Sequence, residues 1–303
     1  MEFAQLTPGS GFEPVRSLLY YSQRIVTRAW ARRLVVGALR KAIRATQGAF
    51  GNDQPLTEEE RTSLALLSSD GYTPLSKLLT ADQIADIMSF MEDKLLEDRV
   101  KEGRKFTFSN VPEDTVAADY NIADIVNCPH ILQLVNNPSL LRLAANYLGC
   151  KPTISALGLR WSFPGQGVAA SLQSFHRDSD DWRFIKVFVY LSEVNDESGP
   201  HVYVRGTQQK GLRLRLRPYS DAGVRESPEG GGIIRVTGPA GFAFMADTSG
   251  IHKGQLPRKR NRLMLQFQYS LLPTYAYRYR PVGYDGPLQI DPYINRLIVG
   301  KSD

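Results

Sequence analysis

Cysteine and long apolar runs are both scarce in this chain of 303 residues. Only Cys128 and Cys150 are present, which excludes a disulfide framework and favours a reducing compartment such as the cytoplasm. The run from Leu34 to Leu39 is far too short to span a bilayer, and the first residues predict no secretory signal. Hydrophobic residues still make up 42% and charged residues 22%, a balance that excludes wholesale disorder and predicts one main domain with an appendage.

Acidic residues are absent between Val15 and Asn52, a segment that contains eight basic residues. Since the whole chain carries a net charge of +6, the remainder without these eight cations carries −2. On a helical wheel the apolar and basic residues occupy opposite arcs up to Arg32, and both arcs rotate from Arg33 onward. We therefore expect residues 1–55 to be a basic amphipathic helical extension, either two short helices or one helix broken near Arg32–Arg33.

The basic extension has two interpretations. Most amphipathic helices simply pack on their own domain. Eight cations without an acid, mixed with Tyr20, Tyr21 and Trp30, instead suit helices that lie at a membrane interface, here through residues 16–44 at the inner face of the membrane. No nucleic-acid recognition motif accompanies the charge, so we expect no nucleic-acid partner.

Residues 56–303 change from helical to strand-like patterns along the chain. Thr57 precedes an acidic first turn, Thr80 fits a capping box, and Leu132 to Leu148 keeps helical spacing. After Lys151, β-rich runs separated by Gly and Pro cover residues 153–163, 184–191, 201–205, 211–217, 232–237, 241–246 and 262–272. Many short strands with turns between them predict an α+β fold with flanking helices around a double-stranded β-helix, or jelly roll.

Histidine is also scarce, and one histidine stands in an informative string. His176 and Asp178 project from the same face of an extended chain, and His252, after a strand and a turn, is the natural third ligand. Two histidines and one carboxylate on one octahedral face are typical of non-haem Fe(II) oxygenases. Arg262 begins a strand ten residues further on, where its guanidinium can hold the remote carboxylate of a 2-oxo dicarboxylic acid.

Other interpretations of these residues are weaker. His-Arg-Asp also opens the catalytic loop of protein kinases, but Arg183 stands where that loop needs Asn, and no Gly-rich loop or Asp-Phe-Gly string is present. An isomerase or hydrolase with a different metal would leave Arg262 without its ligand. His201 is either a spare metal ligand or, as we prefer, a turn or strand-end residue with a local hydrogen bond. We interpret His130 as structural.

Together and in this order, the motifs resemble the phytanoyl-CoA dioxygenase family of Fe(II)/2-oxoglutarate oxygenases. The resemblance extends over about residues 65–272 and rests on the turn at Gly71, the helix from Asn137, His176-Arg177-Asp178, the string Ser198 to Thr207, His252, Arg262 and Tyr269. The resemblance implies that the iron ligands are His176, Asp178 and His252. It also implies that Arg262 binds the carboxylate of the cosubstrate and that the aromatic ring of Phe188 lines the cosubstrate pocket. It also implies Fe(II), 2-oxoglutarate and O2 as participants, with succinate and CO2 as products beside the hydroxylated substrate.

Two positions bear on how this chain compares with the family. Halogenating relatives replace the ligand carboxylate by a small residue, so Asp178 favours hydroxylation. Gly254 stands where a serine is common, so one cosubstrate hydrogen bond is expected to be missing or to come from another residue.

Clusters of arginine indicate that the substrate is an anion. The run Gly211 to Arg217 alternates strictly, and its cations share one strand face: Arg213, Arg215 and Arg217. They are either a solvated edge that resists aggregation or a clamp for an anion. Arg258, Lys259 and Arg260, close behind His252, favour the clamp. We expect hydroxylation of an anionic small metabolite or of an acidic sugar carried on a lipid. The alternative is a non-catalytic jelly-roll binding or scaffold protein at the membrane surface.

Overall fold

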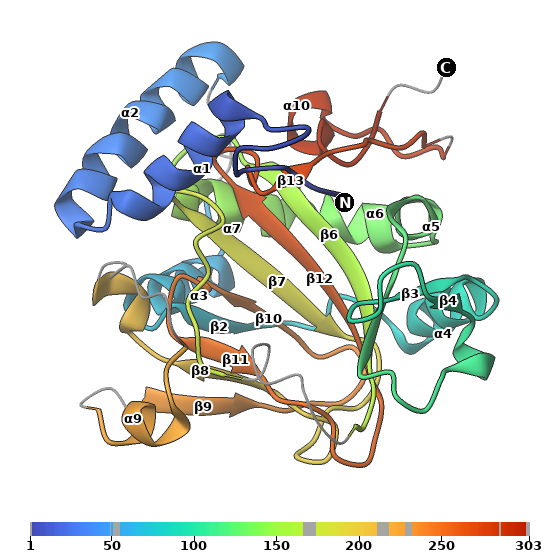
Figure 1. Ribbon diagram of the computed structural model, residues 1–303. Coiled ribbons are helices and arrows are strands. Elements are labelled where there is room, and N and C mark those ends of the chain that lie inside the picture. Colours follow the sequence, from blue (N-terminus) through green and yellow to red (C-terminus); the bar gives the residue numbers. More distant parts are fainter. Residues whose placement is uncertain are drawn as a thin grey trace.

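The computed structural model describes residues 2–48, 50, 55–165, 174–210, 218–227, 232–284 and 286–300. Helices gather in the first half of the chain and strands in the second (Figure 1). The α-helices are α1 (Pro14–Ile25), α2 (Ala29–Gln47), α3 (Glu58–Ser69), α4 (Ala81–Met91), α5 (Ile122–Asn127), α6 (Ile131–Val135), α7 (Pro138–Leu148), α9 (Asp221–Arg225) and α10 (Pro292–Asn295). Short 3-10 helices lie at Phe108–Asn110 and Thr207–Lys210.

The strands form antiparallel sheets. The largest has the order β2-β10-β7-β12-β6-β5-β3-β4, a smaller one has the order β11-β8-β9, and β1 pairs with β13. Their bounds are β1 (Glu2–Phe3), β2 (Tyr72–Leu75), β3 (Leu96–Asp98), β4 (Lys105–Phe106), β5 (Ala117–Tyr120), β6 (Thr153–Ser162), β7 (Phe184–Tyr190), β8 (His201–Val204), β9 (Ile233–Val236), β10 (Ala243–Ala246), β11 (His252–Gly254), β12 (Arg262–Ser270) and β13 (Tyr277–Arg278). The α+β class is thereby confirmed.

The central strand β7 separates two layers of packing. Val187 and Val189 belong to the main core, which also contains residues of α4, α6 and α7. Phe188 and Tyr190, on the alternate face, belong to a second cluster with Tyr203 of the small sheet. The space between the two sheets is therefore where polar side chains of β7 and β12 can meet residues of β8 and β11.

The N-terminal segment forms two helices, but the sequence-based position of the break is wrong. Residues 26–28 separate α1 from α2, whereas Arg32 lies inside α2. The guanidinium of Arg32 is buried, and it donates to the carbonyl of Gln23 at 2.5 Å and to that of Asp181 at 3.0 Å. Val36 and Ile43 of α2 join the main core, and the division of the chain at residue 55 stays a prediction.

The helices and strands after residue 55 agree with the sequence-based predictions in part. The helix expected over Leu132 to Leu148 is two helices, α6 and α7, because Asn137 caps α7 and Pro138 occupies its first turn. Six of the seven expected strands are found as β6, β7, β8, β9, β10 and β12. The seventh, 211–217, lies outside the described residues. Strands β2 to β5, which extend the sheet, were not expected.

Candidate metal centre

Backbone pairing brings the two predicted histidine ligands together. His176 and His252 form an antiparallel bridge in which the N–H of each donates to the carbonyl of the other at 2.9 Å. The N–H of Asp178 donates to the carbonyl of Thr248 at 2.9 Å. The segment 174–178 is thus paired with the chain that leads into β11, and three side chains from two distant parts of the sequence share one site.

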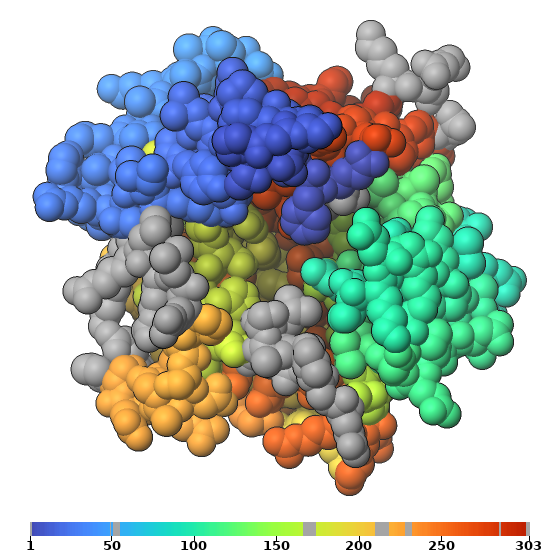
Figure 2. Space-filling model, viewed as in Figure 1, coloured from blue at the N-terminus to red at the C-terminus, as the bar shows by residue number. Residues whose placement is uncertain are grey.

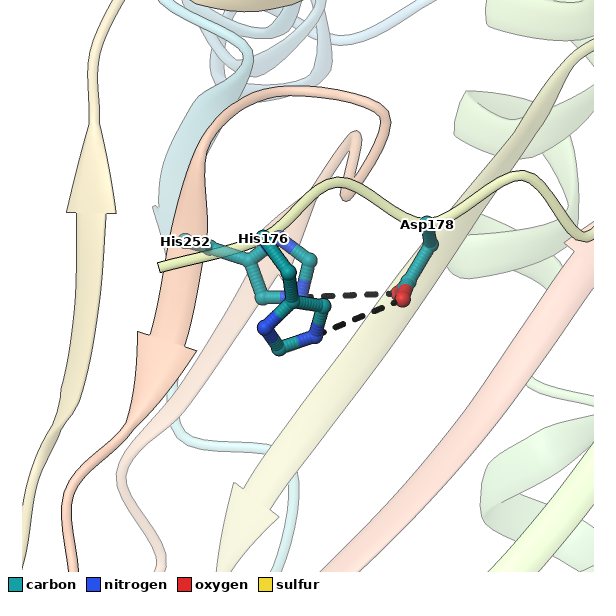
Figure 3. Close-up of side chains that lie close together, drawn as sticks. All are labelled: His176, Asp178 and His252. Carbon is teal, nitrogen blue, oxygen red and sulfur yellow. Dashed lines mark ion pairs between the residues drawn. The ribbon is translucent and has the colours of Figure 1, made fainter. Parts of the chain in front are cut away.

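The three side chains point toward a common centre (Figure 3). The Nε2 atoms of His176 and His252 lie 3.6 and 3.5 Å from the two carboxylate oxygens of Asp178, and the ligand atoms all lie within 4.8 Å of one another. Each Nδ1 faces a nearby carbonyl, of Ser174 at 2.9 Å and of Gly250 at 3.0 Å. Nδ1 therefore donates, and the lone pair of Nε2 is directed at the centre. This donor set fits ferrous iron.

Lys186 is a site residue that the sequence analysis missed. Its ammonium lies 2.6 Å from Asp178 Oδ2 and 2.9 Å from Asp180 Oδ2. Burial alone would raise the pKa of Asp178, but Lys186, His252 and His176 hold it well below its ordinary value. The carboxylate is therefore ionised and ready for a cation. A single lysine within the apolar strand β7 is the signal that could have identified this residue.

Burial keeps His252 neutral. Burial lowers the pKa of His252 to about 4, although the negative charge of Asp178 acts to raise it. At neutral pH the ring therefore has a free lone pair, as a metal ligand requires.

Arg262 is a buried cation that has no carboxylate partner among the described residues. It stands at the start of β12, where Nη1 donates to the carbonyl of Gly199 and Nη2 donates to Ser162 Oγ at 3.2 Å. Its buried Nε has no hydrogen-bond partner. An enclosed guanidinium of this kind is suited to an anionic ligand. Phe188 lies on the same inner side of the large sheet and stacks on Phe244, with ring centroids 4.8 Å apart.

The other predicted cations lie elsewhere or outside the described residues. Arg258 and Arg260 are exposed on the loop after β11. Arg260 lies 3.5 Å from Glu193 and 3.8 Å from Glu197, so its charge is partly matched by acids. The arginines Arg213, Arg215 and Arg217 lie outside the described residues. His130 bonds to Asp86 at 2.8 Å on the surface, whereas the expected local hydrogen bond of the His201 ring is not found.

A cavity of about 530 Å³ lies beside the metal-binding segment. Trp182, Arg183 and Phe184, which follow Asp178 closely in the chain, form part of its wall, and Ser249 adjoins the Thr248 carbonyl that Asp178 contacts. Its charged lining residues are four cations and one acid, namely Arg32, Arg33, Arg40, Arg183 and Asp247. This cluster could not be predicted from the sequence because three of its arginines belong to the N-terminal segment.

Comparisons with known proteins place this geometry in a family. The model of the family described as Phytanoyl-CoA dioxygenase (PhyH) matches residues 67–255, more than half of the chain, and this range includes His176, Asp178 and His252. A search of the curated proteins gave no match.

Several solved structures are similar to this chain. EctD from S. alaskensis with bound Fe is 17% identical, over 83% of this chain and 89% of that chain, with a TM-score of 0.51. The apoform of EctD from S. alaskensis is 18% identical, over 83% and 89% of the two chains, with a TM-score of 0.50. The epimerase SnoN in complex with Fe3+, alpha ketoglutarate and nogalamycin RO is 16% identical, over 76% and 93%, with a TM-score of 0.49.

The family match over the ligand-bearing region agrees with the independent convergence of three side chains that suit iron. The chain therefore belongs to the phytanoyl-CoA dioxygenase (PhyH) family, and it is a non-haem oxygenase that uses iron and 2-oxoglutarate.

Proposed function

We propose that this oxygenase hydroxylates an anionic small molecule, or an acidic sugar carried on a lipid, with iron on His176, Asp178 and His252. The observation that carries the proposal is the convergence of the three ligand atoms within 4.8 Å of one another. The presence of a carboxylate at Asp178 supports hydroxylation. When bound, iron and 2-oxoglutarate supply the oxidising chemistry that inserts oxygen into a C–H bond of the substrate.

The chain's own residues prepare the site for that chemistry. His176 and His252 direct their Nε2 atoms at the centre, and Lys186 holds Asp178 ionised and in position through a contact of 2.6 Å. Arg262 would bind the remote carboxylate of 2-oxoglutarate, since its guanidinium is buried and has an Nε without a partner. Phe188 would line the cosubstrate pocket on the inner face of β7.

The cation-lined cavity supports an anionic substrate. Arg183 lies over the ring of Tyr147, 4.3 Å from its centroid, and no carboxylate pairs with it among the described residues. Burial lowers the pKa of Arg40, and the positive charge of the nearby Arg183 lowers it further. Two guanidinium groups that repel each other in a cavity favour an anion between them. A phosphate or carboxylate of the substrate would bind there.

The exposed surface of α1 and α2 supports the proposal that the substrate is carried on a lipid. These helices meet the core partly through polar side chains, and although Val36 and Ile43 are buried, five other large apolar side chains point outward: Val15 is 72% exposed, Leu18 71%, Ile25 71%, Trp30 56% and Leu34 67%. Figure 2 shows the N-terminal residues, in blue, as a continuous layer at the upper left of the molecule. In the described part of the chain, no helix has the length and apolarity needed to cross a membrane.

We propose that α1 and α2 rest on an anionic lipid surface, at the inner face of a membrane. Four exposed cations stand among the apolar side chains, namely Arg28, Arg33, Lys41 and Arg44. A membrane interface accepts aromatic and aliphatic side chains, and its anionic headgroups attract arginine and lysine. A second copy of this chain that bound here through the same surface would place its own cations against those of the first copy, and the like charges would repel each other.

Anaerobic addition of Fe(II) and 2-oxoglutarate tests the catalytic assignment. The wild-type protein should develop the visible absorption band that ferrous iron and 2-oxoglutarate give when they share one site, and should release succinate once oxygen is admitted. His176→Ala should lose iron binding, the band and succinate formation, because one of three ligands is missing. His130→Ala, which removes a surface histidine, should change none of them.

Undiminished succinate formation by His176→Ala would reject the ligand assignment. A wild-type protein that gives no band and no succinate would instead support the alternative, a non-catalytic binding or scaffold protein with a vestigial metal site. Screening metabolite and lipid extracts for faster succinate release would then identify the substrate of an active enzyme.

A further inference from the structure

His201 is a buried histidine whose ring makes no hydrogen bond among the described residues. The residue is 5% exposed, and its Nε2 is enclosed without a partner. Arg262 has the same property at Nε. An unpaired buried polar atom costs free energy, so two of them near one site call for a common ligand.

The rings around His201 place it in the interior between the sheets. It lies between Phe188, with ring centroids 4.9 Å apart, and the iron ligand His252, whose ring is nearly parallel at 5.4 Å. Phe244 lies 5.4 Å away. The imidazole therefore stands beside the metal centre and against the aromatic residue proposed to line the cosubstrate pocket.

Strand pairing brings His201 toward Arg262. His201 on β8 is the direct cross-strand partner of Gly254 on β11, and direct partners project their side chains from the same face. A Cβ built on Gly254 would lie 3.9 Å from Arg262 Nη2. The space above Gly254 thus borders the guanidinium, and glycine leaves it free on the face from which the imidazole of His201 projects.

We propose that Nε2–H of His201 donates a hydrogen bond to the carboxylate of 2-oxoglutarate that Arg262 binds. The inference rests on the proposed role of Arg262 and adds a second donor to the same group. In the tautomer with its hydrogen on Nε2, the ring offers this enclosed atom as the donor. His201 is then a cosubstrate-binding residue that takes the place of a side chain at position 254.

Binding of 2-oxoglutarate to the Mn(II)-loaded protein tests this role without turnover. Isothermal titration should show that His201→Leu raises the dissociation constant of 2-oxoglutarate at least tenfold, since a hydrogen bond to a charged group is lost. The affinity for Mn(II) should stay the same. His201→Gln, which restores a donor, should bind 2-oxoglutarate within about threefold of the wild type. The surface variant His130→Leu should match the wild type.

A truncated ligand identifies the carboxylate involved. 2-Oxopentanoate lacks the remote carboxylate and should bind equally to the wild type and to His201→Leu. Equal affinity of both proteins for 2-oxoglutarate would overturn the proposal, and so would a parallel loss of Mn(II) affinity in the Leu and Gln variants, which would indicate a structural role. A wild-type protein that binds Mn(II) but not 2-oxoglutarate would count first against the role of Arg262, and with it against that of His201.

Discussion

Lys186 brings a positive charge onto the inner face of β7, beside a carboxylate that must also accept a divalent cation. The ammonium lies 2.6 Å from Asp178 Oδ2. Metal and lysine therefore compete for the same negative charge, and each compensates for the other when one is absent.

Lys186→Met should destabilise the metal-free protein more than the metal-loaded one. Without the ammonium, Asp178 is left as a buried charge without its main partner, which costs roughly 3 kcal/mol. A bound divalent ion replaces that partner. Urea unfolding with chelator and with saturating Mn(II) should show a larger stabilisation by the metal in the variant. Lys151→Met, which breaks a comparable pair with Asp291 away from the site, is the control. Equal losses with and without metal would contradict this account.

At the residue scale the sequence predicts ligands better than it predicts their supports. His176, Asp178 and His252 were identified because their residue types and spacing suit one chemistry. Lys186 and His201 were missed or misread because their importance depends on burial and on a partner across the site. Their neighbours become apparent only when β7, β8 and β11 are assembled.

Glu60 joins two elements, α3 and α7, behind the large sheet. It completes the capping box of α3 with Thr57, and its Oε1 accepts from Ser139 Oγ at 2.5 Å and from Arg142 Nη2 at 2.6 Å. Burial alone would raise the pKa of Glu60, but hydrogen bonds from Arg142, Ser139 and Thr57 hold it below its ordinary value. The ionised form is thus the one that stabilises the fold.

Glu60→Gln should lower the free energy of unfolding at pH 7 by about 2 kcal/mol, because a charged hydrogen-bond acceptor is replaced by a neutral one. A lowered pKa in the folded state means that the stabilisation is present above the ordinary pKa and is lost as the pH falls through the folded value. The difference between wild type and variant should therefore shrink as the pH is lowered below about 4.5. Urea titrations at several pH values would measure it, and a difference independent of pH would refute it.

At the element scale, strands with strong alternating or apolar patterns were predicted, and short ones were not. β6, β7 and β12 have seven to ten residues each and carry an apolar or alternating pattern of their own. β2 to β5 have two to four residues each, and pairing with an existing sheet makes them strands. The break between α1 and α2 was misplaced because the helical wheel treats Arg32 as a solvent-facing cation. In the structure its contacts with the carbonyls of Gln23 and Asp181 put it on the buried side.

The whole molecule has an uneven surface. One layer, built from α1 and α2, combines exposed apolar side chains with cations and has no acid between Val15 and Asn52. Large exposed apolar residues also occur singly on other elements, such as Leu95, which is 51% exposed after α4. These isolated residues are ordinary and provide matched controls for the layer.

Vesicle sedimentation should separate the layer from these controls. The full chain should bind vesicles that contain an anionic phospholipid and remain free of neutral phosphatidylcholine vesicles, and added salt should weaken the binding. Leu18→Ser together with Ile25→Ser should reduce vesicle binding at least tenfold, because two apolar side chains lose their burial. Leu95→Ser should leave it unchanged.

Two results would remove the membrane assignment. One is a wild-type protein that stays in the supernatant with anionic vesicles. The other is an equal loss of binding in the Leu95 control. Light scattering that shows a stable dimer, abolished by the Leu18 and Ile25 substitutions, would assign the layer to a second copy instead.

The contact of Arg32 with the Asp181 carbonyl has a geometric consequence. It fastens the corner between α1 and α2 to the backbone three residues from Asp178. If the helices lie on a bilayer, the iron stands at a constant height above the headgroups. The enzyme would then select among lipids by the height of the reactive carbon above the membrane surface. This selection by distance would act in addition to recognition of charge.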